Sequence, residues 1–259
     1  MRIALGIEYD GSNFSGWQIQ QGTRTVQQCV EQALSQVADC PINVVCAGRT
    51  DTGVHALEQV VHFDCDVSRP DRSWVFGSNA NLSSDVSVLW ARQVDDDFHA
   101  RFSAEKRRYR YIIYSRAIRP TFLSRRVTWD YRKLDERRMQ EAAINLVGKH
   151  DFSSYRATSC QSKSPVRQVY FIEIKRRREF ICIDIEANAF LHHMVRNIAG
   201  VLMEIGSGQR DPDWARQVLE EKDRTLGGVT ALSDGLYLVS VSYPPEYGLP
   251  ALSPTFTVW

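Results

Sequence analysis

Residues 42–65 hold two short apolar runs with a polar segment between them, and this stretch decides how the first part of the chain folds. The runs are Ile42-Asn43-Val44-Val45-Cys46 and Val60-Val61-His62-Phe63-Asp64-Cys65, each of strand length. The segment between them includes Ala47-Gly48-Arg49-Thr50-Asp51-Thr52-Gly53-Val54-His55-Ala56. Its two glycines allow the backbone to bend tightly. We therefore expect strands over 42–46 and 59–65, joined by a loop that carries a cation, an acid and an imidazole.

Two interpretations of this loop are open from its composition. In the first, Asp51 accepts a backbone N–H as an Asx turn and Arg49 is its ion-pair partner, so the loop is purely structural. In the second, the charged side chains carry out chemistry, because catalytic groups are often found on loops that a rigid scaffold positions. An isolated Arg-Thr-Asp in a loop favours the first interpretation.

Outward from this stretch, the patterns predict alternating strands and helices. Alternating apolar residues predict a strand over 3–9, and Thr25-Val26-Gln27-Gln28 has the spacing of a capping box. Apolar residues at helical intervals follow to Val37, and Pro41 ends that helix. A helix over about 71–80 and a strand over 86–94 complete the order β-α-β-β-α-β. This order predicts a split βαβ, ferredoxin-like unit.

The second part of the chain shows a similar mixture of strands and helices. Tyr109, Tyr111 and Ile113 lie on one face of an expected strand, with Arg108 and Arg110 on the other. A helix begins after Asp135 and ends at Gly148, and 150–155 and 160–167 are expected loops. Strands 169–175 and 180–186 form a hairpin. An apolar stripe from 190 to 205, a helix that begins at Asp211-Pro212 and a strand over 236–243 follow.

Charge is unevenly distributed along the chain although its net value is only +1. Residues 101–178 contain 21 basic and 7 acidic side chains, whereas both ends of the chain are acidic. Arginine outnumbers lysine by 11 to 2 in residues 101–138, and guanidinium groups bind phosphate bidentately and stack on bases. The basic middle predicts a phosphate-facing surface, with a solvated face as the alternative.

Cysteine usage and hydropathy favour a reduced cytoplasm. The six cysteines form no Cys-x-x-Cys pair and no zinc spacing with histidine. No apolar run approaches the ~20 residues of a membrane span, and the N-terminus begins directly with a strand pattern instead of a secretory signal. We expect no metal and no cofactor.

Several segments resemble the tRNA pseudouridine synthases of the A type. The longest match is Gly48-Arg49-Thr50-Asp51-Thr52-Gly53-Val54-His55-Ala56, and others cover residues 9–18, 98–104, 107–114, 160–167 and 188–198. The resemblance implies an isomerase that converts uridine to pseudouridine at tRNA positions 38, 39 and 40, and that acts as a homodimer on the anticodon stem-loop. It also implies an α+β fold of two ferredoxin-like subdomains that share a mostly antiparallel central sheet, with a catalytic cleft between them. The expected divisions are 1–103 with the Asp loop, 104–243 with the basic RNA-binding surface, and a tail, 244–259, in which the resemblance fades.

The resemblance also implies roles for individual residues. Asp51 is the expected nucleophile, Arg196 its ion-pair partner, and Tyr109 the residue that stacks on the target base. The bland alternatives are a half-buried strand tyrosine and a solvated helix arginine. The expected RNA-binding residues are Arg49, Tyr109, Phe98, His99, Ala100, Arg101, Phe102, Ser159, Cys160, Gln161, Ser162 and Lys163.

Two rival functions use the same residues differently. A catalytically silent RNA-binding module would keep the basic middle and make Asp51 dispensable. A metal-dependent nuclease or phosphatase would use Asp51, His55, His192 and His193, but it lacks a carboxylate cluster or His-x-x-x-His spacing. For the synthase, the sequence leaves open whether the carboxylate attacks covalently or acts as a base.

Overall fold

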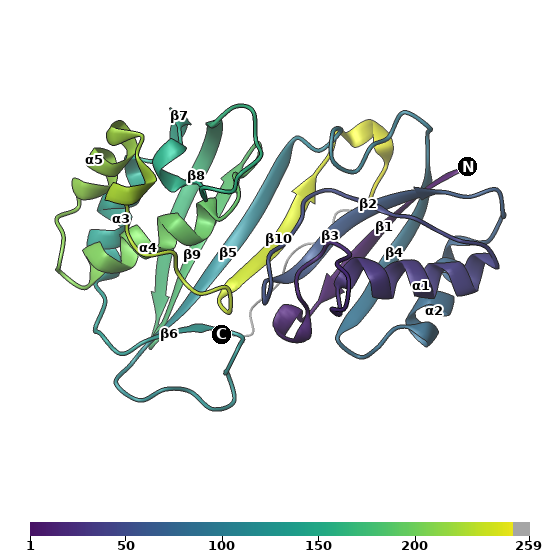
Figure 1. Cartoon of the computed structure of the whole chain (residues 1–259), viewed down its shortest axis with the longest axis horizontal. Coiled ribbons are helices and arrows are strands. Elements are labelled where there is room, and N and C mark those ends of the chain that lie inside the picture. The colour runs from purple at the N-terminus through teal and green to yellow at the C-terminus, as the bar shows by residue number, and fades with distance from the viewer. Residues whose placement is uncertain (251–259) are drawn as a thin grey trace. The chain divides into compact units, whose positions relative to one another are not determined.

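The strand predicted over residues 3–9 is β1 (Arg2–Tyr9) in the computed structural model, which describes residues 1–250 (Figure 1). The chain divides into two compact units, and the first consists of Met1–Glu105 together with residues 237–250. It contains the predicted order of strands and helices. These are β1, α1 (Val26–Ala38), β2 (Val45–Cys46), β3 (His55–Asp64), α2 (Asp71–Asn81) and β4 (Val86–Val94), followed by β10 (Leu236–Ser242).

The first unit has a mostly antiparallel sheet. β1 pairs with β3 on one side and with β4 on the other, both antiparallel, and Leu5 lies opposite Val61. The edge of β3 that faces away from β1 pairs with two different strands. β2 pairs antiparallel with its distal part, and β10 pairs parallel with its beginning, where Tyr237 lies opposite His55. The first residues of β3 are therefore fixed on both edges.

Apolar alternation explains which face of this sheet is covered. Ile3, Leu5 and Ile7 of β1 are buried, and Ile3 lies opposite Phe63 of β3, whereas α1 and α2 cover one face of the sheet (Figure 1). Phe63 of β3 contacts Trp74 of α2 edge to face, with ring centroids 5.1 Å apart. Burial of these large side chains contributes roughly 1.5–3 kcal/mol each.

The second unit, Lys106–Leu236, is also mixed α/β. Its sheet has the order β5-β9-β8-β7, all antiparallel, with β6 added in parallel to β5. Helices α3, α4 and α5 lie beside this sheet, and α3 packs on both β8 and α4 (Figure 1). The elements are β5 (Lys106–Ser115), β6 (Thr128–Asp130), α3 (Glu136–Ile144), β7 (Gly148–Asp151), β8 (Val166–Arg177), β9 (Phe180–Ala187), α4 (Met194–Gly206) and α5 (Trp214–Glu221).

Most predicted elements of the second unit are confirmed. The Asp135 carboxylate accepts from the amides of Arg137 and Arg138 and so caps α3, which ends at Ile144, before the predicted Gly148. The hairpin has the predicted strands, and its turn is tighter than expected because β8 extends to Arg177. On β5, Tyr111 and Ile113 are buried on one face, as their alternation predicts.

Two predictions near α1 are wrong, because in each case other groups bind the backbone amides concerned. The strand over 42–46 shortens to Val45–Cys46 because α1 side chains take the earlier amides: Ile42 N donates to Ser35 Oγ and Val44 N to Glu31 Oε1. The capping box does not form either. The amides of Val26 and Gln27 donate to the carbonyls of Gly16 and Trp17, and the Thr25 hydroxyl makes no cap hydrogen bond.

Three boundaries in the second unit also differ. The apolar stripe begins at 190, but α4 begins only at Met194, because His193 has a left-handed backbone with φ of 62°. Residues 211–214 form a turn, so α5 begins at Trp214 with Asp213 as its N-cap. Residues 150–151 of the first expected loop, 150–155, belong to β7. Residues 166–167 of the second expected loop, 160–167, belong to β8.

No helix within residues 1–250 combines the length and the apolar character that crossing a membrane requires. Of the predicted tail, residues 245–247 form a short 3₁₀ turn. Residues 251–259 lie outside the part of the chain that the structure describes.

Candidate active site and nucleic-acid interface

The loop between β2 and β3 is anchored to the sheet at its first residues. Gln59 lies in β3 and is fully buried. Its Nε2 donates to Gly48 O at 2.5 Å, and Gly48 N donates back to its Oε1 at 3.4 Å. Ala47 N also donates to Val60 O at 2.8 Å. The amide of Gln59 thus replaces the strand pairing that ends at Cys46.

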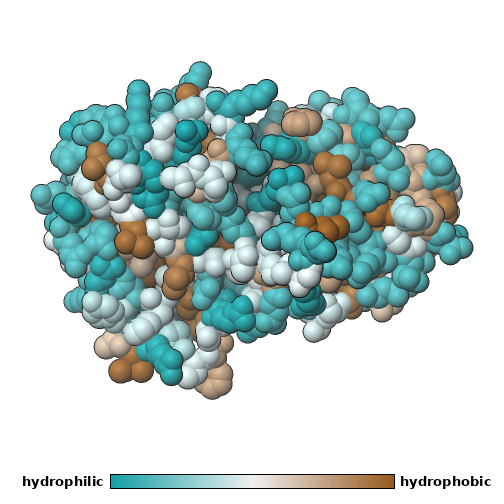
Figure 2. Space-filling view, in the orientation of Figure 1, coloured by the Kyte–Doolittle hydropathy of each residue, from teal (hydrophilic) through white to brown (hydrophobic). Residues whose placement is uncertain are grey.

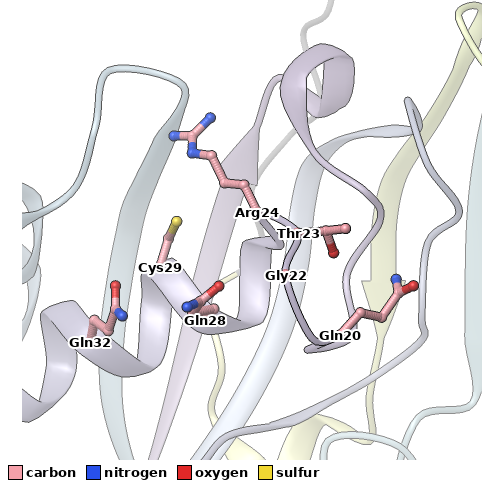
Figure 3. Close-up of a pocket in the computed structure, with 7 residues that line it drawn as sticks. All are labelled: Gln20, Gly22, Thr23, Arg24, Gln28, Cys29 and Gln32. Atoms are coloured by element: carbon pink, nitrogen blue, oxygen red, sulfur yellow. The ribbon is translucent and has the colours of Figure 1, made fainter.

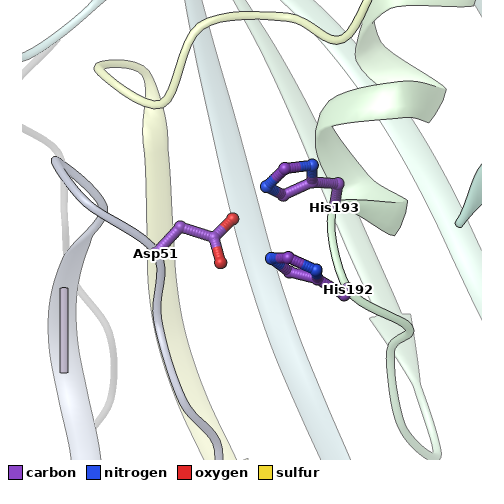
Figure 4. Close-up of side chains that lie close together, drawn as sticks. All are labelled: Asp51, His192 and His193. Atoms are coloured by element: carbon purple, nitrogen blue, oxygen red, sulfur yellow. The ribbon is translucent and has the colours of Figure 1, made fainter. Parts of the chain in front are cut away.

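The centre of the loop, around Asp51, is held from a second direction. Thr50 is buried, its Oγ1 lies 2.7 Å from Tyr9 Oη, and its carbonyl accepts from Trp17 N at 3.0 Å. The backbone of Gly16 packs so closely that an added Cβ would lie 2.8 Å from Thr50 O. Asp51 itself is half-buried at the apex (Figure 4), and its carbonyl accepts from Val54 N. A carboxylate is therefore presented on a loop with little freedom to move.

His55 closes the loop and has a structural role. It is buried at the start of β3, where its Nδ1 accepts from Gly11 N at 3.1 Å and lies 3.2 Å from Asp10 Oδ1. Its ring stacks on Tyr237 of β10, with centroids 4.6 Å apart. Because Nδ1 accepts from a backbone amide, the proton of the neutral ring lies on Nε2, and neither nitrogen offers a lone pair for the metal-ligand role that the nuclease alternative requires.

The segment 98–102 of the first unit separates into buried and exposed residues. Phe98 and Ala100 are fully buried. Arg101 is exposed, and Phe102 is 76 % exposed. The Arg101 guanidinium lies over the Phe102 ring, 5.6 Å from its centroid. The exposure of His99 is intermediate between that of the buried residues Phe98 and Ala100 and that of the exposed residues Arg101 and Phe102. An exposed aromatic ring beside a guanidinium is a typical platform for an unpaired base.

Tyr109 of the second unit is largely buried on β5, with 9 % of its surface exposed. Phe190 meets its ring edge to face, with centroids 5.0 Å apart. The neighbouring arginines of β5 are on the opposite face, where both bind Asp184: Arg108 at 3.2 Å and Arg110 at 3.0 Å. These two guanidinium groups are thus committed to a buried carboxylate.

Arg196 lies in the first turn of α4 and is tied to the 228–231 loop. Its Nε donates to Ala231 O at 2.8 Å, and Ala231 N donates to Arg196 O at 3.2 Å. This loop can approach the helix because Gly200 has no side chain: an added Cβ would lie 1.9 Å from Val229 O. The guanidinium is therefore oriented by backbone groups.

The residues just before α4 link Arg196 to the 159–163 loop. The rings of His192 and His193 lie 4.0 Å apart (Figure 4), and His192 Nδ1 is 3.3 Å from Ser159 Oγ. The Ser162 hydroxyl accepts from Arg167, and Gln161 and Lys163 are exposed. Residues 190–196 therefore bring the second unit's candidate residues together.

The candidate residues are divided between the units. Arg49, Asp51 and residues 98–102 belong to the first unit, and Tyr109, residues 159–163 and Arg196 belong to the second. Sequence reasoning missed the residues that position the Asp51 loop, namely Tyr9, Gly16 and Gln59. Of these three residues only Gln59 could have been noticed in the sequence, because it is a polar residue directly before the apolar run that begins at Val60.

Two other features of the first unit lie outside these candidates. A polar hollow beside the beginning of α1 is lined by residues that include Arg24, which is paired with Asp85 at 2.7 Å (Figure 3). Glu58 is buried on the sheet face opposite Phe63 and accepts from Trp90 Nε1 at 3.0 Å. Burial raises the pKa of the Glu58 carboxyl to about 7.

Basic side chains in the second unit concentrate in the loop between β5 and β6. Residues 116–126 contain four arginines and no acidic residue. The loop also exposes Phe122, at 94 %. Hydrophilic residues dominate the face of the molecule in Figure 2, and hydrophobic residues form small separate patches on it. The composition of this loop fits a nucleic-acid backbone better than an apolar partner.

Comparisons with known proteins agree on one family. A family model described as tRNA pseudouridine synthase matches residues 6–103 and 142–244. A protein of Nitrosococcus oceani named tRNA pseudouridine synthase A is 61 % identical over 259 residues, which covers all of both chains. One of the same name from Coxiella burnetii is 58 % identical over 251 residues, covering 97 % of this chain and 96 % of its own.

A third relative extends the agreement, and a solved structure adds little. The protein of Methylococcus capsulatus, also named tRNA pseudouridine synthase A, is 57 % identical over 249 residues, covering 96 % of this chain and 92 % of its own. The structure titled "Crystal Structure of a Cbf5-Nop10-Gar1 Complex" aligns with a TM-score of 0.30 at 10 % identity, over 77 % of this chain and 54 % of that one. A likeness of that size carries no argument.

Proposed function

Because the chain belongs to the tRNA pseudouridine synthase family and isomerises uridine in tRNA, we propose that Asp51 is the carboxylate that carries out this reaction. The observation that supports it most is the anchoring of its loop. Gln59, Tyr9 and Trp17 hold the residues that flank Asp51 from separate elements. A catalytic group has to be held within about 0.5 Å of its productive position, and an anchored loop serves that need.

The reaction breaks two bonds, N1–C1′ and C5–H, and forms two, C5–C1′ and N1–H. The N1–C1′ glycosidic bond of uridine is cleaved, the uracil rotates, and its C5 bonds to C1′, with the C5 proton transferred to N1. Atoms and electrons balance without an oxidant or an energy source. The Asp51 carboxylate can attack the nucleoside covalently, or it can remove a proton from the ribose to form an unsaturated sugar intermediate. Both routes require an ionised carboxylate.

We propose that Arg196 keeps this carboxylate ionised. A carboxylate removed from water favours its neutral form unless a cation lies beside it. The backbone contacts of Arg196 with Ala231 orient its guanidinium from the second unit. A preorganised cation of this kind stabilises charge without reorganising during the reaction.

The target base has to leave the helical stack before Asp51 can reach it. Extrusion of a nucleotide costs a few kcal/mol, which other contacts have to offset. We propose that Arg49 fills the vacated place in the stack and that Tyr109, braced by Phe190, packs on the extruded uracil. Base–aromatic stacking contributes about 1–3 kcal/mol.

The substrate positions we propose are uridines 38, 39 and 40 in the anticodon stem-loop. The chain has to accept adjacent nucleotides in varied sequence, which suits recognition by shape and backbone better than readout of base edges. We propose that the 116–126 loop, residues 98–102 and residues 159–163 bind the tRNA, and that a homodimer in the cytoplasm is the working form. The strand order β4-β1-β3-β2 supports a ferredoxin-like arrangement in the first unit.

Incubation of purified protein with an unmodified tRNA transcript, with chelator and without added metal, tests the proposal. We expect pseudouridine at positions 38–40 with wild type and none with Asp51→Ala, which should still bind tRNA. Asp211→Ala, whose side chain is exposed, is the matched control and should behave as wild type. Binding of tRNA without pseudouridine formation by wild type, with or without chelator, would support the RNA-binding alternative. Loss of wild-type activity only with chelator would support the metal-dependent one, and full activity of Asp51→Ala would exclude Asp51 as the catalytic carboxylate.

A further inference from the structure

Residues 98–103 form a segment in which every backbone N–H has a partner. Phe98 N donates to Asp95 O, His99 N to Ser103 Oγ and Ser103 N to His99 O. The other three amides donate to imidazole nitrogens. Ala100 N donates to His62 Nδ1 at 3.1 Å, and the amides of Arg101 and Phe102 donate to His99 Nδ1 at 3.1 and 3.2 Å.

These three bonds fix the protonation state of both histidines. An imidazole nitrogen accepts a hydrogen bond only when it carries a lone pair, so Nδ1 has to be unprotonated in each ring. Protonation would turn Nδ1 into a donor that faces other donors. The two rings lie 4.8 Å apart, and the segment therefore depends on a neighbouring pair of neutral imidazoles.

The segment so held has a buried side and an exposed side. The Phe98 ring packs between Tyr243 and Tyr247, with centroids 5.1 and 5.0 Å away, and Tyr243 Oη donates to Ala100 O at 2.6 Å. On the other side Phe102 rests on the His99 ring, 4.3 Å between centroids, and exposes most of its surface. His99 thus supports the Phe102 side chain and binds its backbone.

We propose that the neutral rings of His62 and His99 are positioning residues that hold Arg101 and Phe102 as a stacking platform for an unpaired base of the tRNA. This inference rests on the proposed RNA contact of residues 98–102. It adds that the contact requires unprotonated histidines beneath it. His62 and His99 act through the loop, and Phe102 and Arg101 touch the RNA.

The surroundings keep both rings neutral near pH 7. Burial, then Arg2 of β1 and the neighbouring His99, lower the pKa of His62 to about 4, and Asp64 of β3 opposes this shift. Burial, Arg2 and Arg101 lower the pKa of His99, against the effect of its own backbone. Other ionisable side chains that face the segment are Tyr243, Tyr247, which contacts the Phe98 ring, and Cys46, which interacts with Arg101. The platform is therefore intact at neutral pH and is lost on acidification.

The expected sign is the reverse of the usual one. Protonation of histidine adds positive charge, which normally strengthens binding to RNA. Here it removes the acceptors for three amides, so the share of affinity that Phe102 supplies has to fall. The quantity to follow is the affinity ratio of wild type to Phe102→Ala, because general charge effects cancel in it.

Three variants and a control test the inference. His99→Phe keeps a ring under Phe102 but offers no acceptor, whereas His99→Asn offers Oδ1 near the place of Nδ1 and does not titrate. Phe102→Ala removes the platform itself. His150→Phe, a histidine of the second unit whose Nε2 contacts Val147 O, is the matched control. Hydrogen exchange of the 100–102 amides and the Kd for an unmodified tRNA transcript are measured at pH 7.5 and 4.5, the lower pH being close to the pKa of His62.

We expect His99→Phe to accelerate exchange at the amides of Arg101 and Phe102 and to raise Kd roughly tenfold. Phe102→Ala should raise Kd by about the same factor. The His99→Phe/Phe102→Ala double variant should bind tRNA no more weakly than either single variant. His99→Asn should recover part of the affinity. The affinity ratio of wild type to Phe102→Ala should shrink at pH 4.5 more than the ratio of His99→Asn to the His99→Asn/Phe102→Ala double variant. Unchanged exchange and Kd in His99→Phe, or fully additive losses, would overturn the inference. An unaltered Kd in Phe102→Ala would overturn it too, while wild-type pseudouridine formation that depends on Asp51 would leave the proposed catalytic function standing.

Discussion

The Arg196 guanidinium donates a hydrogen bond from Nε to the backbone carbonyl of Ala231. We expect Arg196→Met to remove about 1 kcal/mol of stability and to lower kcat by about 10²-fold or more, with a smaller change in KM, because the cation acts on the charged carboxylate. Single-turnover kinetics on tRNA and thermal unfolding measure the two effects.

Arg216→Met is the matched control for this substitution. Arg216 is exposed on α5, where it is ion-paired with Asp213 and Glu220. Its replacement should leave kcat unchanged. Near-normal turnover of Arg196→Met would remove the ion-pair argument, whereas an equal loss in both variants would indicate a general effect of losing positive charge.

Glu58 gives a stability prediction with a defined pH window. Burial raises the pKa of its carboxyl from 4.5 to about 7, so the folded chain retains a proton that the unfolded chain releases in this range. The free energy of unfolding therefore falls as pH rises from about 4.5 to about 7. Glu58→Gln keeps an acceptor for Trp90 Nε1 and has no charge to bury. We expect it to exceed wild type by about 1–3 kcal/mol at pH 8 and to equal it at pH 4.5, by urea unfolding. A stability difference that does not change with pH would contradict this.

At the scale of the element, the segment around Gly16 and the Asp51 loop are packed against each other. Gly16 has φ of +87°, and an added Cβ would lie 2.8 Å from Thr50 O and 3.2 Å from the Asp51 carbonyl carbon. We expect Gly16→Ala to cost about 2–4 kcal/mol and to lower turnover, because both backbone strain and a shift of the loop result.

Gly22→Ala separates these two causes. Gly22 also has a positive φ, +75°, but an added Cβ would meet nothing within 4 Å. This variant should lose only the roughly 1–2 kcal/mol of left-handed backbone strain and keep normal turnover. If Gly16→Ala and Gly22→Ala have the same kcat, the packing of residue 16 does not position Asp51.

The elements also show how far the sequence alone reaches. Apolar periodicity locates β1, α1, α2 and β4, because their own residues decide those faces. It fails where a distant partner intervenes. The carboxylate and hydroxyl of Glu31 and Ser35 take the amides of the predicted strand at 42–46, and a left-handed His193 delays α4. Gln59, which anchors the Asp51 loop, is visible in the sequence only as a polar residue beside an apolar run, and its role cannot be predicted because it exists only once β3 is paired.

At the scale of the whole molecule, charge is the property that the sequence predicts most directly, since counting needs no contacts. Residues 101–178 have a net charge of +14. Part of it is committed: Arg108 and Arg110 bind Asp184, and Arg132 binds Asp130 and Glu204. The sequence could not identify these structural arginines, because their pairing depends on strand register.

The arginines of the 116–126 loop make the last prediction, which concerns tRNA affinity. If about six phosphates are neutralised, log Kd should rise with log salt with a slope of about 4 or steeper, because each contact releases bound counterions. Arg119→Gln and Arg126→Gln should each weaken binding and lower the slope by about 1, without changing preference among tRNA sequences. Arg210→Gln, in the acidic C-terminal part of the chain, should leave the slope unchanged. Filter binding between 50 mM and 500 mM salt measures it, and an affinity that stays flat across this tenfold range would exclude the electrostatic footprint.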